Sequence, residues 1–354
     1  MRKLIGAVVG LAVLGAVGTC ALSRCGGGET PAPLWSLSDL PPLDQSDANG
    51  WVGLAAAVQA DLHVEPPDAV RDAVAMVEQD DTETFTERLA ETREALDSMM
   101  ADPKVQAALA AWRVATEAQS FSDGCPADPG TSCPHFDVYR LGQTATAEIL
   151  WMRAHGDEVA AFSALAQMVA LHREYRTSSR NLFAAVSATA SLKRSVALAA
   201  LLVSAREDES ASAVQARAQL RSALDTVGRD QAVARRALIG EYLMANAYLR
   251  AIIDGDPELV GEDVATQRWL FDEAWARVRI DGLFTTAMQA LEGGSPMPAQ
   301  AEAPSWMDTL THPIGAPMVR TLDPGMSANP ILEELRRDRE VLARQCDELL
   351  VQTW

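Results

Sequence analysis

The stretch that decides the fold is residues 137–176, which read DVYRLGQTATAEILWMRAHGDEVAAFSALAQMVALHREYR. Apolar residues recur there every three or four positions on both sides of one break, as in amphipathic helices. The break is His155-Gly156-Asp157-Glu158, in which Asp157 is suited to cap a second helix. The apolar positions are Val138, Leu141, Ala145, Ile149 and Met152 before the break, and Phe162, Leu165 and Val169 after it. The stretch therefore predicts two long helices joined by a short acidic turn.

Similar acidic breaks recur along the chain. Asp208 and Asp256 follow Asp157 at intervals of 51 and 48 residues, and each lies where a helix N-cap is expected. Helix pairs that cannot bury their apolar faces alone stack on one another. We therefore expect an all-α fold, a compact α-solenoid of antiparallel, tetratricopeptide-like pairs with a non-standard repeat length. The pairs are expected at about 137–176, 179–227 and 230–291.

The flanking segments complete one helical domain, expected over residues 50–354. An earlier helical group covers about 50–119, in which Asp102-Pro103 forms an N-cap and first helical position. Residues 293–329 are rich in Pro, Gly and Met, lack a period and are expected to form a long connection. Asn329-Pro330 is then expected to cap a final helix of about 330–352.

Residues 137–335 also carry a family resemblance. The long helix, the Gly-Asp turn and a second helix containing Ala161 and Ala164 resemble an enlarged tetratricopeptide unit. Together with Thr311-His312-Pro313-Ile314-Gly315, these pairs resemble a group of uncharacterised, exported, all-helical bacterial proteins. The resemblance implies a helical fold rather than a particular chemistry.

The first 23 residues predict export. Arg2 and Lys3 precede a charge-free run of twenty residues that ends in small side chains, the pattern of a signal peptide or membrane anchor. Cys20 is a lipidation candidate, because the preceding residues resemble a bacterial lipobox. Cleavage after Ala21 and retention as an anchor are the alternatives, since twenty helical residues span about 30 Å. Residues 24–49 are expected to be a disordered Pro/Gly-rich tether.

Composition narrows the class of partner. The chain has 354 residues, 48% of them apolar, which is enough for a large core. Acidic residues outnumber basic ones 49 to 30, for a net charge of −19. A duplex must be met by clustered Lys and Arg, so we expect no nucleic-acid partner.

The cysteines agree with an oxidising compartment. Cys125 and Cys133 border a tight Pro/Gly loop, and a disulfide between them would stabilise the fold by about 2–3 kcal/mol. A metal site with His135 and Asp137 is the alternative, although paired C-x-x-C knuckles are absent. Cys346 lies on the apolar face of the last helix and is expected to be a buried thiol.

Few residues point to chemistry. No nucleophile elbow, Walker A loop, H-E-x-x-H helix or dinucleotide fingerprint is present, and no cofactor or metal is expected. Two functional candidates are Glu241, in a long apolar helix, and His312, in a proline-bracketed loop. Arg173, Arg176 and Arg180 could line one surface between helices, although such residues usually face solvent or pair with acids.

The sequence thus favours an exported protein at the periplasmic face of a membrane, or a secreted one, that acts as an interaction or structural module. It would meet a protein partner in the envelope and the membrane through its N-terminus. The alternatives are an envelope hydrolase or lyase near Glu241 or His312, and a binding protein for a small or lipidic ligand.

Overall fold

The computed structural model describes residues 32–59, 68–79, 82–126, 130–262, 271–298, 312 and 315–351. Over these residues the backbone is mainly helical and forms no β-strand, so the all-α prediction is confirmed. The arrangement of successive helix pairs is compatible with a solenoid. Cys20 and the leader lie outside the described residues, as do Trp306 and Ile314 of the long connection.

The described residues divide into two compact units, where the sequence predicted one domain. Two of the boundaries fall at 237/238 and 333/334, inside α10 (Val233–Asp254) and α16 (Pro324–Leu350). The helical pattern continues through these two boundaries, so no linker in the sequence marks them. The large unit contains residues 41–59, 68–79, 82–126, 132–237 and 334–351, and the small unit 32–40, 130–131, 238–262, 271–298, 312 and 315–333.

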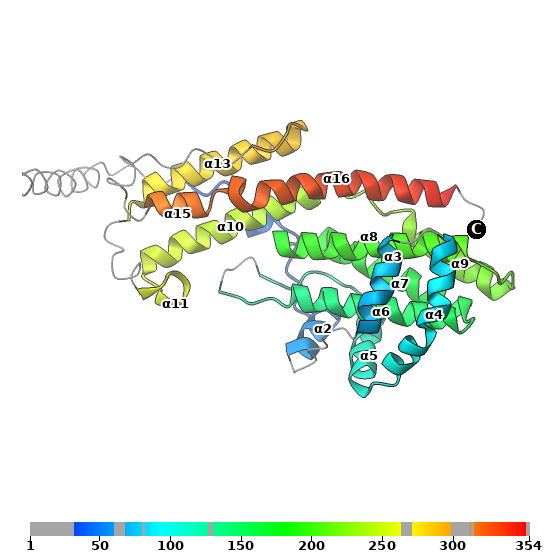
Figure 1. Cartoon of the computed structure of the whole chain (residues 1–354). Coiled ribbons are helices and arrows are strands. Elements are labelled where there is room, and N and C mark those ends of the chain that lie inside the picture. Colours follow the sequence, from blue (N-terminus) through cyan, green and yellow to red (C-terminus); the bar gives the residue numbers. More distant parts are fainter. Residues whose placement is uncertain are drawn as a thin grey trace, which may run out of the picture. The chain divides into compact units, whose positions relative to one another are not determined.

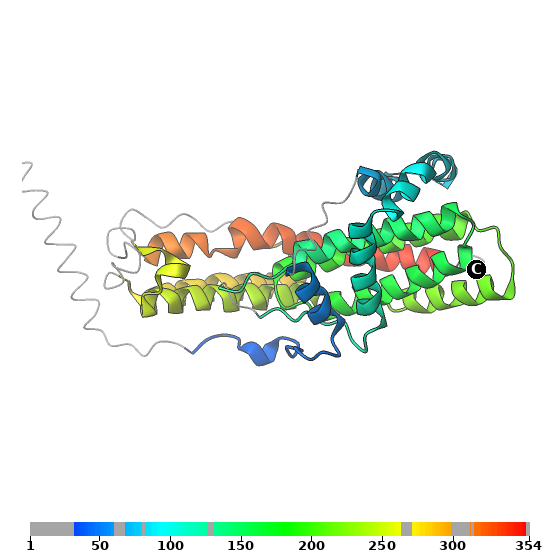
Figure 2. The ribbon, with the colours of Figure 1, turned by 90° about the horizontal axis from the view of Figure 1, so that it is seen from below.

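Helices occupy the three segments predicted as pairs, and the first two of them, α6 and α7, pack against each other. Within the large unit, α6, α7 and α8 lie side by side, and α9 packs on α7 (Figures 1 and 2). The large unit holds α2 (Gly50–Gln59), α3 (Asp68–Gln79), α4 (Thr82–Met100), α5 (Pro103–Glu117), α6 (His135–Ala154), α7 (Glu158–Ser178), α8 (Leu182–Ser204) and α9 (Ala211–Leu224). The small unit holds the 3-10 turn η1 (Leu37–Asp39), α11 (Pro257–Val260), α13 (Glu273–Gly293) and α15 (Gly315–Thr321).

Helix α8 lies at the centre of the large unit's core. Its buried side chains include Leu192, Val196 and Leu202, each about 1% exposed or less. By length and composition it is the one described helix that could cross a membrane, but 67% of its most apolar window is buried inside the protein. A helix that is apolar all round is expected in the middle of a large helical core.

The capping predictions are confirmed at two of the three acidic breaks. Asp157 accepts a hydrogen bond from the backbone N–H of Ala160 at the start of α7, and Asp256 caps α11 in the same way. Asp208 is different, because the N-cap of α9 is Ser210. The Asp208 carboxylate instead accepts the backbone N–H of Ser210, which fixes the turn before the helix. Both residue types suit an N-cap, so local sequence did not distinguish them.

The final helix begins earlier than predicted. α16 starts at Pro324 and continues through Pro330, so Asn329 is not its cap. Asp323-Pro324 and Asn329-Pro330 are equivalent start signals six residues apart, and the helix uses the first. The Asn329 side chain is buried and donates to the carbonyl of Pro298 at 2.9 Å. The predicted aperiodic connection therefore contains α15 and the first turns of α16.

Residues 32–49 make defined contacts where a disordered tether was expected. In the large unit, the Asn49 side chain donates to the carbonyls of Asp44 and Ser122 and accepts the N–H of Ser122. In the small unit, the N–H of Leu34 donates to the Tyr242 hydroxyl at 2.7 Å, and Trp35 packs edge-on against the same ring. Prolines prevent a helix here, but polar and aromatic side chains still find partners. Residues 24–31 lie outside the described part of the chain.

Candidate functional site

The predicted disulfide is present. Cys125 and Cys133 are bonded, with their Cα atoms 6.1 Å apart, and Cys125 is fully buried. His135 lies beside them, and one of its nitrogens is within 4.8 Å of both sulfurs. Its Nδ1 is 2.7 Å from the Tyr175 hydroxyl, while its Nε2 accepts from the Asn181 amide at 3.3 Å. The sulfurs and both ring nitrogens are thus engaged, and the cluster ties the disulfide loop to α7 and α8.

A buried carboxylate anchors the other side of this loop. Asp123 is 0% exposed and accepts the backbone N–H groups of Cys125 and Arg180, both at 3.0 Å. Burial raises the pKa of Asp123 to about 6, against the lowering effect of those two hydrogen bonds. Burial also lowers the pKa of His135 to about 4, so its ring is neutral at physiological pH. Cys346 is a buried free thiol, as predicted, and burial raises its pKa to about 12.

His312 has neighbours that the sequence did not indicate. Its ring stacks on Trp275 in α13, with centroids 4.2 Å apart and planes 13° apart. Its Nδ1 lies 3.7 Å from a carboxylate oxygen of Asp272, which also caps α13. This arrangement gives His312 an acidic partner and an aromatic support within the small unit. Asp137, which the sequence placed with His135 in the alternative metal site, has its Oδ1 3.9 Å from Nη1 of Arg140 on the same helix.

Glu241 is half-buried on α10, and the adjacent Tyr242 carries the described polar contacts. The Tyr242 hydroxyl donates to Asp281 at 2.8 Å and accepts the N–H of Leu34. Burial raises the pKa of Asp281, while its hydrogen bond from Tyr242 acts in the opposite direction. The sequence named Glu241 and not Tyr242, because the Tyr242 ring falls on the apolar stripe of the helix.

The most distinctive hollow of the large unit is lined by arginines. It has a volume of about 460 Å³ and lies among α7, α8 and the turn between α9 and α10. We call it the arginine pocket. Its lining residues are Arg173, Arg176, Thr177, Leu192, Thr226, Gly228, Arg229 and Asp230. The volume falls within the range of ordinary small-ligand sites, about 300–1,000 Å³.

Arg176 is the unusual residue of this pocket. It is 1% exposed, and its Nε donates to the Thr189 hydroxyl at 3.2 Å. Among the described residues, no group accepts a hydrogen bond from its Nη2. Burial lowers the pKa of Arg176, and the negative charge of Asp230 opposes that shift. A buried guanidinium nitrogen with no acceptor is costly, so Arg176 has one donor that the described residues leave unused.

The other charged residues around the pocket are only partly engaged. Arg173 donates to the Thr226 hydroxyl, and Arg229 pairs with Asp225 at 3.0 Å. Both members of the latter pair are more than half exposed, so the pairing is weak. Asp230, the one acid in the lining, is engaged by Arg236 from α10.

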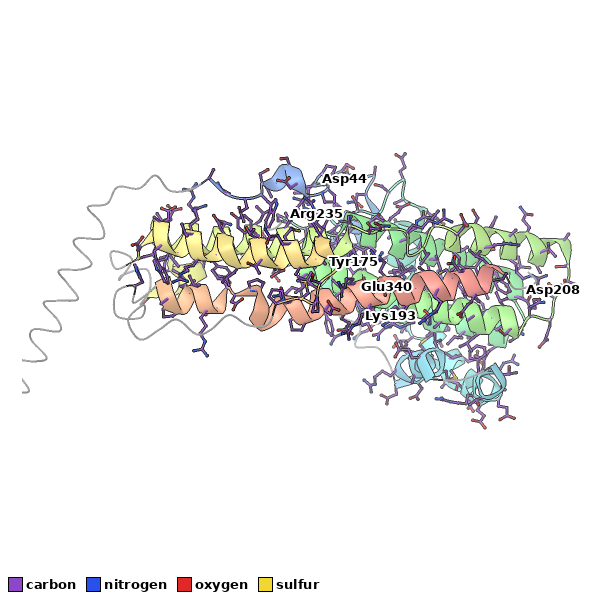
Figure 3. The ribbon with its side chains drawn as sticks, turned by 90° about the horizontal axis from the view of Figure 1, so that it is seen from above. Asp44, Tyr175, Lys193, Asp208, Arg235 and Glu340 are labelled. Carbon is purple, nitrogen blue, oxygen red and sulfur yellow. A yellow bond between two sulfur atoms is a disulfide. The ribbon has the colours of Figure 1, made fainter. Side chains whose placement is uncertain are left out.

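Gly228 shapes the turn that closes the pocket. Its φ is +78°, a conformation that favours glycine. A Cβ placed on it would lie 2.8 Å from the backbone N and Cα of Ala343 in α16, which leaves no room for a side chain. The same part of α16 is tied to α8 by an ion pair of 2.7 Å between Lys193, labelled in Figure 3, and Asp338. Two parts of the pocket lining, the turn at Gly228 and helix α8, are therefore held in place by contacts with α16.

A smaller hollow of about 280 Å³ lies among α5, α6 and α7. Its lining includes Trp112, Thr116 and the ion pair between Arg113 and the buried Glu148. Here the buried charge already has its counter-charge. The two hollows thus differ in whether their buried ionic group is satisfied.

The structure separates the three arginines that the sequence grouped together. Arg173 and Arg176 line the pocket, whereas Arg180 donates to the carbonyl of Pro41. The sequence missed Arg229 and Gly228, which come from a turn about fifty residues further along the chain. The i, i+3 spacing of Arg173 and Arg176 was the one sequence signal that these two side chains lie on the same helix face.

In comparisons with known proteins, no family model, curated protein or solved structure matches this chain.

Proposed function

We propose that the protein is an exported, envelope-associated helical binding module and that the arginine pocket holds its ligand, a small anion. The supporting observation is the buried Arg176 guanidinium, whose Nη2 has no acceptor among the described residues. A buried donor without an acceptor costs about 1–3 kcal/mol, and an anionic ligand that accepts from it would offset that cost. In a chain with 49 acidic and 30 basic residues, an arginine cluster facing a hollow is unlike the rest of the composition.

Binding is tested with two matched variants. Thr177 lies exposed on the lining of the arginine pocket, and Thr116 lines the smaller hollow. We expect small anions to raise the melting temperature of the wild type and of Thr116→Trp, but not of Thr177→Trp, in which the indole obstructs the pocket. Stabilisation should follow ligand concentration as linkage requires, about 2.7 kcal/mol at one hundred times Kd. If no small anion stabilises the wild type, the proposed function is wrong.

Export is supported by the leader pattern and by the Cys125–Cys133 disulfide, since such bonds persist in oxidising compartments. Fractionation and intact-mass analysis of native material test it. We expect membrane-associated or secreted protein, with the mass of a diacylated Cys20, a shortened chain or an uncleaved anchor. Full-length chain recovered from the cytosol would refute export.

A second candidate function, docking of a protein partner, is favoured by exposed aromatic side chains. Phe136 is 60% exposed and Phe183 is 72% exposed, at the first turns of α6 and α8. The bond between His135 and Asn181 holds those two turns together. Exposed aromatic anchors on rigid elements are typical of interface centres. A Phe136→Ser, Phe183→Ser double variant should lose an envelope partner that Val278→Ser, a control at another exposed apolar residue, retains.

The hydrolase or lyase alternative would use His312 in the small unit. The carboxylate of Asp272 lies near its Nδ1 and could orient the ring so that Nε2 acts as a general base. Turnover of peptidoglycan fragments by the wild type, lost in a folded His312→Ala protein, would support this alternative. Unchanged turnover in that variant would exclude His312 as the base.

A further inference from the structure

The arginine pocket presents guanidinium groups from two directions. Arg173 and Arg176 lie three residues apart on α7, and Arg229 comes from the turn between α9 and α10. Arg176 has an Nη2 without an acceptor among the described residues. Arg229 is held by an exposed ion pair with Asp225, which it can exchange at little cost. A ligand entering the pocket would therefore meet three cationic side chains.

The net charge of the lining indicates how much negative charge the anion carries. The lining contains three arginines and one acid, Asp230, so 3 − 1 leaves an excess of two positive charges. Including the outer partners Arg236 and Asp225 adds one charge of each sign and leaves the excess at two. A single carboxylate would neutralise half of this excess. A phosphate monoester carries between −1.5 and −2 charges near neutral pH and matches it.

The arrangement of donors agrees with the charge. A phosphoryl group offers three terminal oxygens, and guanidinium groups bind such oxygens through paired N–H donors. The Thr226 hydroxyl, which accepts from Arg173, adds one further donor to the lining. The Thr177 hydroxyl instead donates to the carbonyl of Glu174. The volume of about 460 Å³ is larger than one phosphoryl group needs, and Leu192 provides an apolar contact for the rest of a ligand. A bare inorganic ion would leave most of that volume unused.

We infer that the arginine pocket binds the phosphoryl group of a small phosphate monoester, with Arg173, Arg176 and Arg229 as its ligands. This inference rests on the proposed function and specifies its ligand class. The monoester can come from a soluble metabolite or from the headgroup of a phosphomonoester lipid, and both present the same chemistry to the pocket.

The test uses the chain without its leader, residues 24–354, and four probes. Glycerol 3-phosphate, inorganic phosphate and succinate are titrated by calorimetry, and vesicles containing phosphatidic acid are compared with vesicles of phosphatidylcholine alone. We expect glycerol 3-phosphate to bind at least tenfold more tightly than succinate, which has the same charge but no phosphoryl group. Inorganic phosphate should compete with it weakly.

Two charge-removing variants locate the binding. Arg176→Met should weaken glycerol 3-phosphate binding by about 10- to 100-fold, the value of a charge-assisted hydrogen bond. Arg71→Met removes the same charge from an exposed site on α3 and should leave binding unchanged. Arg173→Met gives a second measurement should Arg176→Met fail to fold.

The outcomes separate the inference from the proposed function. If succinate binds as tightly as glycerol 3-phosphate in an Arg176-dependent manner, the phosphoryl inference is wrong and the anion site stands. If neither the soluble anions nor the phosphatidic acid vesicles bind, both fail. Arg176-dependent sedimentation with phosphatidic acid vesicles, without binding of glycerol 3-phosphate, supports the inference and identifies a lipid headgroup as the source.

Discussion

Removing the carboxylate of Glu158 should destabilise the large unit more than any surface charge change. Glu158 is the first residue of α7 and is 3% exposed. One of its oxygens accepts from Arg217 in α9 at 3.0 Å. The other accepts the backbone N–H groups of Glu207 and Asp208, at 3.0 and 3.3 Å. A single side chain therefore joins the start of α7 to the turn before α9 and to α9 itself.

The magnitude follows from what Glu158→Ala leaves behind. The Arg217 side chain is 1% exposed, and its remaining acid partner, Glu209, is 73% exposed and so contributes little. Breaking a buried ion pair by removing one partner costs about 3–5 kcal/mol. Water can reach the turn, so the two freed backbone N–H groups add less than a fully buried pair would. We expect a loss of about 3–5 kcal/mol in the free energy of unfolding.

Urea unfolding, followed by circular dichroism, measures this loss. The double variant Glu158→Ala, Arg217→Met should recover part of it, because it replaces both charges and leaves no buried charge alone. Glu207→Ala is the matched control, since that side chain is 78% exposed and its pair with Arg153 should contribute less than about 1 kcal/mol. A loss below about 1 kcal/mol for Glu158→Ala, with an unchanged m-value, would refute the reasoning.

Three further predictions concern buried groups. Unreduced peptide maps should recover Cys125 and Cys133 as one linked peptide pair, and separately alkylated cysteines would contradict the bond. Burial, and then the charge of Arg194, lower the pKa of His172 to about 3, so its neutral ring stabilises the fold fully above pH 6.5. That contribution is lost as pH falls towards 3, and His172→Gln should flatten the acid limb of the stability profile. Asp123 acts in the opposite direction: its raised pKa means that stability falls by up to about 3 kcal/mol as pH rises from 4 to 6, and Asp123→Asn should remove this slope.

The sequence by itself determined the features that depend on neighbours within about one turn of helix. Asp102 and Asp157 cap their helices as predicted, because an N-cap bond joins residues only two or three positions apart. The disulfide could also be predicted from the sequence, since Cys125 and Cys133 are only eight positions apart. Apolar spacing of 3.6 residues likewise predicted the all-α class before any packing was known.

Only the tertiary structure decided which of two equivalent local signals is used and which polar groups become buried. Ser210 rather than Asp208 caps α9, and α16 starts at Pro324 rather than at Asn329. Arg176 looks in sequence like any surface arginine, yet it is fully buried. Burial and shared cavities are set by helices tens of residues away, as when the turn of Gly228 packs on α16 behind the pocket. Such contacts form only when the helices pack together, so no window of sequence around Arg176 contains them.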